Sequence, residues 1–200
     1  MNKTPLFFSI ISIFSITGFI YFFWPRSCQL STAEIRAYIS DVNTTRNALE
    51  GLGATLKSDY AFTDYIYQPN DRHVDLSKEF IRLRVYEKTA WKQKNYVLVH
   101  KLKGPAGMTG QTPIHKEFDT LAEAQHALKD NYHLDFQFYR KGWEYQFSAM
   151  KIFVEDVQNI RPTIEVVTPN KKDIDSLFEK LGLTEIITDS VPRLIEKQKK

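Results

Sequence analysis

The sequence predicts an antiparallel α+β domain, with about eight strands that close into a β-barrel and helices that flank it, preceded by one transmembrane helix. Most of the chain alternates apolar and polar residues at the two-residue period of a strand, and short turns separate these stretches. Aromatic residues make up 14% of the chain, which also favours β-structure. An uncharged stretch near the N-terminus predicts the membrane helix.

This N-terminal stretch, Leu6–Trp24, contains no charged residue. As a helix with about 1.5 Å rise per residue, it nearly spans a hydrocarbon core of roughly 30 Å. Tyr21 and Trp24 near its end suit the headgroup region. We therefore expect a single-pass membrane protein, with an anchor in residues 1–26 and a folded domain in residues 27–200. The basic residues on the two sides nearly balance, so the side that the domain occupies stays open.

Two other interpretations of this stretch stay open. A cleavable signal peptide usually has a shorter apolar region and ends in small residues, whereas this segment ends in Trp24-Pro25-Arg26-Ser27-Cys28. A lipoprotein signal would use Cys28 as the lipidated residue, although Pro25 and Arg26 replace the usual aliphatic and small residues. Because Cys28 is the only cysteine, no intramolecular disulfide can form.

Composition narrows the classes of partner. The hydrophobic content of 42% and the charged content of 26% are ordinary for a globular protein. The net charge of +3 is too small to indicate bulk nucleic-acid binding, so we expect no nucleic-acid partner. The oligomeric state is left open.

The first half of the domain predicts a strand, then a helix, then mostly strands. Asp41 or Asn43 can cap the helix, and Gly51 or Gly53 can end it. The strands are expected at residues 33–39, at 54–67 as one or two strands, and at 81–86, 96–103 and 112–118.

The second half begins with a helix that opens at Asp119 or Thr120. Asn170 caps a later helix that Gly182 closes. The tail beyond it predicts a short strand and a basic helix. Between the two helices, strands are expected at residues 134–145, 146–155 and 160–168.

Basic residues recur at alternate positions of two predicted strands. Arg82 and Arg84 flank a leucine in the first, and Lys101 and Lys103 flank a leucine in the second. Side chains at positions i and i+2 share one face of a strand, so these cations can line one sheet surface. Such a surface is either a solvated outer face or a binding surface for a polyanion, and both interpretations stay open.

Other charged residues favour the polyanion. Arg140 lies among aromatic residues, an unusually apolar place for an isolated cation, and carboxylates occupy strand positions at Glu34, Glu117 and Glu165. Guanidinium groups bind phosphate oxygens in bidentate fashion. Carboxylates hold Mg²⁺ or Mn²⁺, which bridges phosphates. A barrel interior with both kinds of side chain would suit a metal-bound polyphosphate.

The order of these features resembles the CYTH superfamily of triphosphate tunnel metalloenzymes, which includes class IV adenylyl cyclases, thiamine triphosphatases and inorganic triphosphatases. The resemblance covers roughly residues 33–195. The segments that carry it are Glu34-Ile35-Arg36, Asp64-Tyr65-Ile66-Tyr67-Gln68-Pro69, Arg82-Leu83-Arg84, Lys101-Leu102-Lys103-Gly104-Pro105, His115-Lys116-Glu117, Phe138-Tyr139-Arg140 and Thr163-Ile164-Glu165.

This resemblance implies a triphosphate tunnel whose ligand is a triphosphate or a nucleotide. It implies Mg²⁺ or Mn²⁺, held by Glu34, Glu117 and Glu165. Phosphate contacts are implied for six basic residues, the last of which falls where the family's final segment closes over the tunnel: Arg82, Arg84, Lys101, Lys103, Arg140 and Arg193.

Several positions depart from the family pattern. Arg36 and Tyr38 replace the second Glu and the Lys of the opening motif, His115 replaces an Arg, Phe138 replaces a Lys, and Val167 replaces a Glu. The carboxylate pairs that would chelate a metal are therefore halved. Two functions stay open: an active metal-dependent triphosphatase or nucleotidyl cyclase, and a degenerate binding or interaction module that keeps the anion tunnel without the chemistry. An outer basic face without a ligand is a third.

Overall fold

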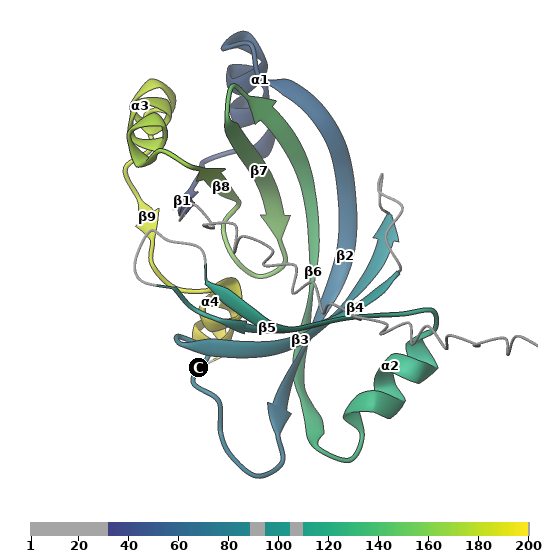
Figure 1. The fold of residues 1–200 in the computed structure, drawn as a ribbon. Helices are drawn as coiled ribbons and strands as arrows, with labels where there is room; N and C mark the ends of the chain where they lie inside the picture. The colour runs from purple at the N-terminus through teal and green to yellow at the C-terminus, as the bar shows by residue number, and fades with distance from the viewer. Residues whose placement is uncertain (1–31, 89–94, 105–109, 200) are drawn as a thin grey trace, which may run out of the picture.

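A computed structural model describes residues 32–88, 95–104 and 110–199, which form one antiparallel sheet of nine strands and four helices (Figure 1). The strands lie in the order β5-β4-β3-β2-β6-β7-β8-β1-β9. Their bounds are β1 (Ala33–Tyr38), β2 (Thr55–Pro69), β3 (Glu79–Lys88), β4 (Tyr96–Leu102), β5 (Gln111–Phe118), β6 (Tyr132–Phe147), β7 (Met150–Val157), β8 (Thr163–Thr168) and β9 (Ile186–Ile187). The helices are α1 (Val42–Gly51), α2 (Leu121–Leu128), α3 (Lys171–Leu181) and α4 (Val191–Gln198).

Each helix begins at a short polar side chain that accepts a hydrogen bond from the first turn. Asp41 accepts from the Thr44 backbone N–H at 2.7 Å, and Thr120, Asn170 and Ser190 cap α2, α3 and α4 in the same way. Helix α3 ends at Gly182 in the left-handed conformation, with φ of 66°, which a residue without a Cβ adopts at low cost. The caps predicted at Asn170 and Gly182 are therefore confirmed.

The two longest strands, β2 and β6, pair along their whole length and run through the molecule from end to end (Figure 1). The β2–β6 ladder shifts register between Leu56 and Ser58 and again between Ile66 and Tyr67. Such bulges bend a strand and increase its twist. The twisted pair carries β7, β8 and β1 on one side and β3, β4 and β5 on the other, so the whole sheet curves.

Three apolar clusters pack the helices against the sheet. Helices α1 and α3 cover β1, β7 and β8, helix α2 covers β3, and helix α4 packs on the apolar end of β2 and β6. Alternation within each strand decides which side chains join these clusters. Ile164 and Val166 of β8 face the helices, whereas Thr163 and Glu165 are on the opposite face. The opposite face therefore receives the charged residues.

The prediction of a closed barrel is wrong. Strands β5 and β9 are the two edges of the sheet, and no ladder joins them among the described residues. Pro113 lies within β5 and has no backbone N–H to donate, as is typical of an edge strand. Strand β9 has only two residues, and it pairs with β1. The local period predicts strands but does not determine whether the two edge strands of the sheet meet.

The membrane prediction is also corrected. The anchor expected at Leu6–Trp24, the proposed boundary at residue 26 and Cys28 all lie outside the described residues. Within residues 32–88, 95–104 and 110–199, no helix combines the length and the apolar character needed to cross a membrane.

Candidate functional site: a charged cavity on the concave face of the sheet

The concave face of the curved sheet encloses a cavity of about 870 Å³. Its wall comes from β1, β2, β3, β4, β6, β7 and β8, and the segment from β9 to the start of α4 borders it as well. This volume lies within the usual range of small-molecule sites, roughly 300–1,000 Å³. Arginines, lysines and glutamates at alternate strand positions line it, so the charged face predicted from the sequence encloses a cavity instead of lying flat against solvent.

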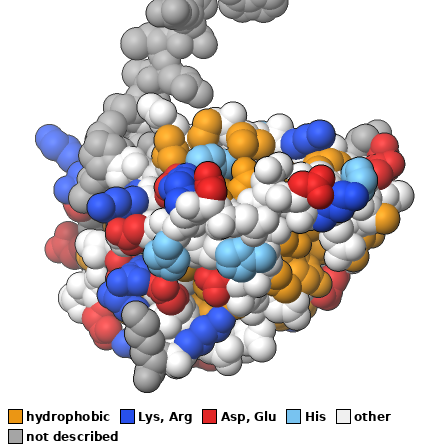
Figure 2. Space-filling view, turned by 90° about the horizontal axis from the view of Figure 1, so that it is seen from below, with side chains coloured by type: hydrophobic (Ala, Val, Ile, Leu, Met, Phe, Trp, Pro, Cys, Tyr) orange, Lys and Arg blue, Asp and Glu red, His pale blue; other side chains and the backbone are white. Residues whose placement is uncertain are grey.

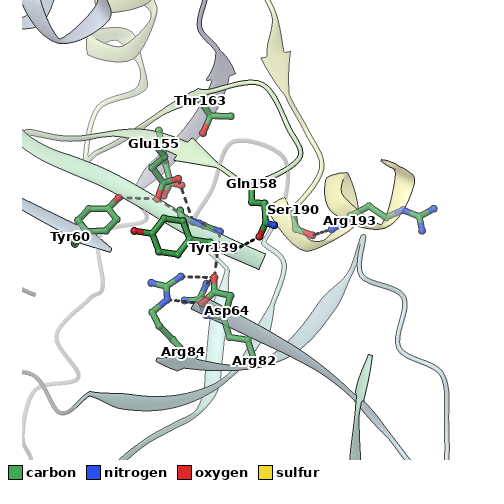
Figure 3. Close-up of polar contacts among 12 residues, drawn as sticks. Tyr60, Asp64, Arg82, Arg84, Tyr139, Glu155, Gln158, Thr163, Ser190 and Arg193 are labelled. Atoms are coloured by element: carbon green, nitrogen blue, oxygen red, sulfur yellow. Dashed lines mark hydrogen bonds and ion pairs between the residues drawn. The ribbon is translucent and has the colours of Figure 1, made fainter. Parts of the chain in front are cut away.

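Asp64 of β2 is at the centre of the charged wall and is fully buried. Arg84 donates two hydrogen bonds to its carboxylate, at 2.7 and 2.9 Å. Arg82 and Arg140 lie at 3.6 and 3.5 Å from the same carboxylate. Figure 3 shows Arg82 and Arg84 converging on Asp64. Burial alone would raise the pKa of Asp64, but the guanidinium groups of Arg84 and Arg82 outweigh it and lower the pKa to about 2.

Arg82 is incompletely compensated in this cluster. Its Nε, like that of Arg140, is buried without a hydrogen-bond partner in the described part of the chain. Burial and repulsion by Arg84 lower the pKa of Arg82 to about 10, although Asp64 opposes the shift. Arg84 differs, because its bidentate contact with Asp64 outweighs burial and raises its pKa above the usual value. One carboxylate thus serves three guanidinium groups, and Arg82 receives the smallest share.

A second buried carboxylate, Glu155 of β7, binds the remaining cations on this side of the cavity. Arg140 donates to it at 3.1 Å, Tyr60 donates at 2.8 Å, and Arg36 forms an ion pair with it. Burial would raise the pKa of Glu155, but Arg140 and Arg36 lower it well below its usual range. Burial, followed by the charge of Glu155, raises the pKa of Tyr60 well above its usual value. Tyr60 therefore remains a hydrogen-bond donor at neutral pH.

The ring of Phe62, which lines the cavity, contacts two of the arginines. The Arg84 guanidinium lies 3.5 Å from its ring centroid, and the Arg140 guanidinium lies 5.3 Å from it. Contacts of this kind attract a cation to the ring face. They also hold the guanidinium groups in fixed positions, which pre-organises the wall for a ligand.

Two lysines extend the cationic wall from β4. Lys101 lies 3.6 Å from Glu34 across the cavity, and burial lowers its pKa. Lys103 follows the end of β4, is exposed and donates to the Thr188 carbonyl beyond β9. Lys103 therefore spans the gap between the β4 end of the sheet and the β9 segment, at the rim of the cavity.

The structure brings together five of the six basic residues predicted as phosphate contacts. Four of them face the cavity from the strands and one is at its rim: Arg82, Arg84, Lys101, Arg140 and Lys103. Arg193 is different, because its side chain pairs with Glu196 on α4 and points away from the cluster (Figure 3). Their role in binding phosphate remains a prediction.

The residues of this cavity do not fit Mg²⁺ or Mn²⁺. Glu34 and Glu165 line it, but Glu34 pairs with Lys101 and Glu165 pairs with Arg36. Glu117 lies on β5 beside His115 with 42% of its side chain exposed, outside the main cavity. Among the residues that the structure describes, no group of three or more His, Cys, Asp or Glu side chains could hold a metal ion. A hard cation needs several such oxygen ligands.

Sequence reasoning gave no role to Asp64, Glu155 or Tyr60, which connect the arginines. Asp64 pairs with Arg84 across the β2–β3 ladder, a register that a single strand does not reveal. The available signal was the position of these carboxylates within apolar stretches, at Asp64 and at Glu155.

The exterior offers a contrast with the cavity. On the face in Figure 2, Lys and Arg side chains are interspersed with Asp and Glu, and no extended patch of one sign appears. Exposed ion pairs such as Arg72–Glu79 and Arg161–Glu185 fit this pattern. Mixed surfaces of this kind give little preference for a polyanion.

No protein-family model matches the chain, and neither does any curated protein. Several solved structures share its fold. A protein from Pyrococcus horikoshii OT3 superposes with a TM-score of 0.68 and 15% identity over 84% of this chain and 99% of that one. A proposed adenylate cyclase from Vibrio parahaemolyticus gives 0.63 and 12% identity over 83% and 98%.

A third solved structure is a proposed adenylyl cyclase from Hippeastrum that is described as having a dominant triphosphatase activity. Its TM-score is 0.56, with 12% identity over 76% of this chain and 85% of that one. Identities this low establish a common fold and do not transfer an activity. The shared fold agrees with the resemblance that the sequence shows.

Proposed function

We propose that this chain, which has the fold of the CYTH superfamily, binds the phosphate groups of a triphosphate or nucleotide in its concave cavity. The observation that carries the proposal is Arg82, a cavity-lining guanidinium with an unpaired buried Nε and a pKa lowered to about 10. A buried cation without full compensation is costly, and an anion beside it removes that cost.

The neighbours of Arg82 supply the rest of the binding surface. Arg84 lies two residues away on the same face of β3. Lys101 is in the same wall, and burial lowers its pKa. Charge-assisted hydrogen bonds from such groups to phosphate are about twice as strong as neutral ones. A phosphate chain that contacts Arg82, Arg84 and Lys101 together would be held by an array of groups fixed before binding.

The proposal is for binding without metal-dependent turnover. Hydrolysis or cyclisation is the second candidate, favoured by the triphosphatase activity described for the Hippeastrum protein. It would require carboxylates able to hold a divalent ion beside the phosphates. Because Glu34, Glu155 and Glu165 are each engaged by a basic side chain, the cavity is better suited to the first candidate.

Calorimetric titration of the full chain with tripolyphosphate and with ATP tests the proposal. We expect saturable binding that weakens about 10- to 100-fold in Arg82→Gln, the loss of one charge-assisted contact. Arg161→Gln is the matched control, because Arg161 is an exposed arginine that pairs with Glu185 outside the cavity. Equal binding by wild type and Arg82→Gln would contradict the proposal. Phosphate release dependent on Mg²⁺ or Mn²⁺ would establish the second candidate instead.

A further inference from the structure

We infer that Arg36 is a built-in cation that occupies the place of a divalent metal, so that the cavity binds its phosphate ligand as the free anion. This inference rests on the proposed function for the identity of the ligand. It makes a separate claim about the carboxylates that surround Arg36, and that claim can be tested without any phosphate.

Arg36 lies on β1 opposite Glu165 of β8 in the strand register. Its guanidinium forms ion pairs with Glu165 and with Glu155 of β7, and it donates to the Thr163 hydroxyl at 2.9 Å. The side chain is only 13% exposed. One positive group thus joins carboxylates from two neighbouring strands and a hydroxyl of β8. Two carboxylates and a hydroxyl are the kind of oxygen set that a hard divalent cation would otherwise take.

Two further carboxylates near the cavity are engaged by cations as well, whereas Glu144, which also lines it, accepts a hydrogen bond from Ser58 at 3.5 Å. Glu34 pairs with Lys101, and Asp64 faces Arg82, Arg84 and Arg140. Glu144 alone cannot supply the several oxygen ligands that a divalent cation needs, so the cation would also have to displace a guanidinium or an ammonium from one of the paired carboxylates. The displaced group would then be buried without a partner, at a cost of several kcal/mol per ion. The fixed cations therefore exclude the metal.

This arrangement determines whether Mg²⁺ strengthens or weakens tripolyphosphate binding. In solution Mg²⁺ binds to phosphate chains and reduces their negative charge. A site with carboxylates for the metal gains from that complex, whereas a site of fixed guanidinium groups prefers the uncomplexed anion. Excess Mg²⁺ should therefore weaken tripolyphosphate binding by about tenfold or more, and EDTA should leave it unchanged.

Mn²⁺ binding, measured by electron paramagnetic resonance on the full chain without phosphate, tests Arg36 directly. We expect no stoichiometric Mn²⁺ site in wild type or in Arg36→Lys, which keeps the positive charge. Arg36→Gln releases Glu165 and leaves Glu155 with Arg140 and Tyr60 as its remaining partners, so this variant should gain one Mn²⁺ per chain. Arg161→Gln, a matched change in an exposed Arg–Glu pair, should gain none.

The outcomes separate this inference from the proposed function. One stoichiometric Mn²⁺ in wild type that Glu165→Gln abolishes would overturn the role of Arg36, even if Arg36→Gln failed to fold. Tripolyphosphate binding that requires Mg²⁺ would overturn it as well. Absence of any phosphate binding, with no Mn²⁺ site in wild type, would contradict the proposed function and leave the claim about the metal supported.

Discussion

Arg82 and Arg84 lie two residues apart on the same strand and line the same cavity, but their electrostatic environments are opposite. Arg84 binds both oxygens of the buried Asp64, whereas Arg82 lies 3.6 Å away and is repelled by Arg84. Two arginines on the same face of one strand thus differ in role. We interpret Arg84 as a structural cation and Arg82 as the one that a ligand completes.

This difference predicts stability changes of different size for the same substitution. Arg84→Gln leaves Asp64 with two distant partners, so the free energy of unfolding should fall by about 3–5 kcal/mol. Arg82→Gln removes an under-compensated charge, so unfolding without ligand should cost the same free energy as in wild type or slightly more. Urea denaturation of both variants measures this, and a larger loss in Arg82→Gln than in Arg84→Gln would contradict it.

Asp64 also predicts how stability depends on pH. Its pKa is about 2 in the folded chain against an ordinary value of 3.8, so its contribution is fully present above pH 3.8 and is lost as pH falls to about 2. The shift corresponds to about 2 kcal/mol. Glu155, whose pKa is also lowered, adds a loss of the same sign. Urea midpoints should therefore drop steeply between about pH 4 and pH 2, and a flat profile there would show that these pairs are not formed.

At the scale of the elements, the approach of β2 to β6 depends on Gly142. These strands pair at Tyr60 and Gly142, and a Cβ at Gly142 would collide with the Tyr60 ring. The ring cannot move freely, because its hydroxyl donates to Glu155 at 2.8 Å. Gly142 therefore leaves the space that the Tyr60 ring needs to reach Glu155.

Gly142→Ala should displace Tyr60 and break its hydrogen bond to Glu155, with a loss of about 1–3 kcal/mol in the free energy of unfolding. Gly51→Ala is the matched control, because a Cβ there, at the end of α1, would meet no described atom within 4 Å. The control should be neutral or more stable by up to about 1 kcal/mol. Equal destabilisation by both changes in a urea titration would argue against the role given to Gly142.

The sequence predicted most of the elements, because period and caps are local properties. The order of strands and helices from Ala33 to the basic last helix was found, and β2 is the single strand that one of the two readings of 54–67 allowed. The closure of the sheet was predicted wrongly, because the meeting of β5 and β9 depends on overall curvature. Pro113 in β5 was the available warning that this strand lies at an edge.

For the site, alternation placed the cations on one face but could not name their partners. Asp64 and Glu155 reach the arginines through registers between separate strands, β2 with β3 and β6 with β7. Arg193 was expected at the tunnel and lies instead beside Glu196, since its own helix supplies a nearer carboxylate. Pairing within a sheet is a long-range property, and one sequence does not determine it.

At the scale of the whole molecule, the two faces of the sheet carry different kinds of side chain. The face toward α1, α2 and α3 is apolar, whereas the concave face holds the charged groups, with an apolar cluster under α4 at one end. Such a fold buries its polar residues at the cost of stability, and a bound anion should restore part of that loss.

Ligand binding should therefore raise the stability of the whole chain. At a tripolyphosphate concentration about 100 times its dissociation constant for wild type, the free energy of unfolding should rise by about 2.7 kcal/mol. Arg82→Gln, which binds more weakly, should gain much less at the same concentration. Thermal unfolding with and without tripolyphosphate measures this, and an identical shift in both proteins would place the binding elsewhere on the molecule.

The most direct test is a crystal structure of the full chain grown with tripolyphosphate. We expect the phosphate chain inside the concave cavity, within hydrogen-bond distance of Arg82 and Lys101, with Arg36 still between Glu155 and Glu165. Phosphate bound only to exterior lysines, with the cavity occupied by water alone, would contradict the account.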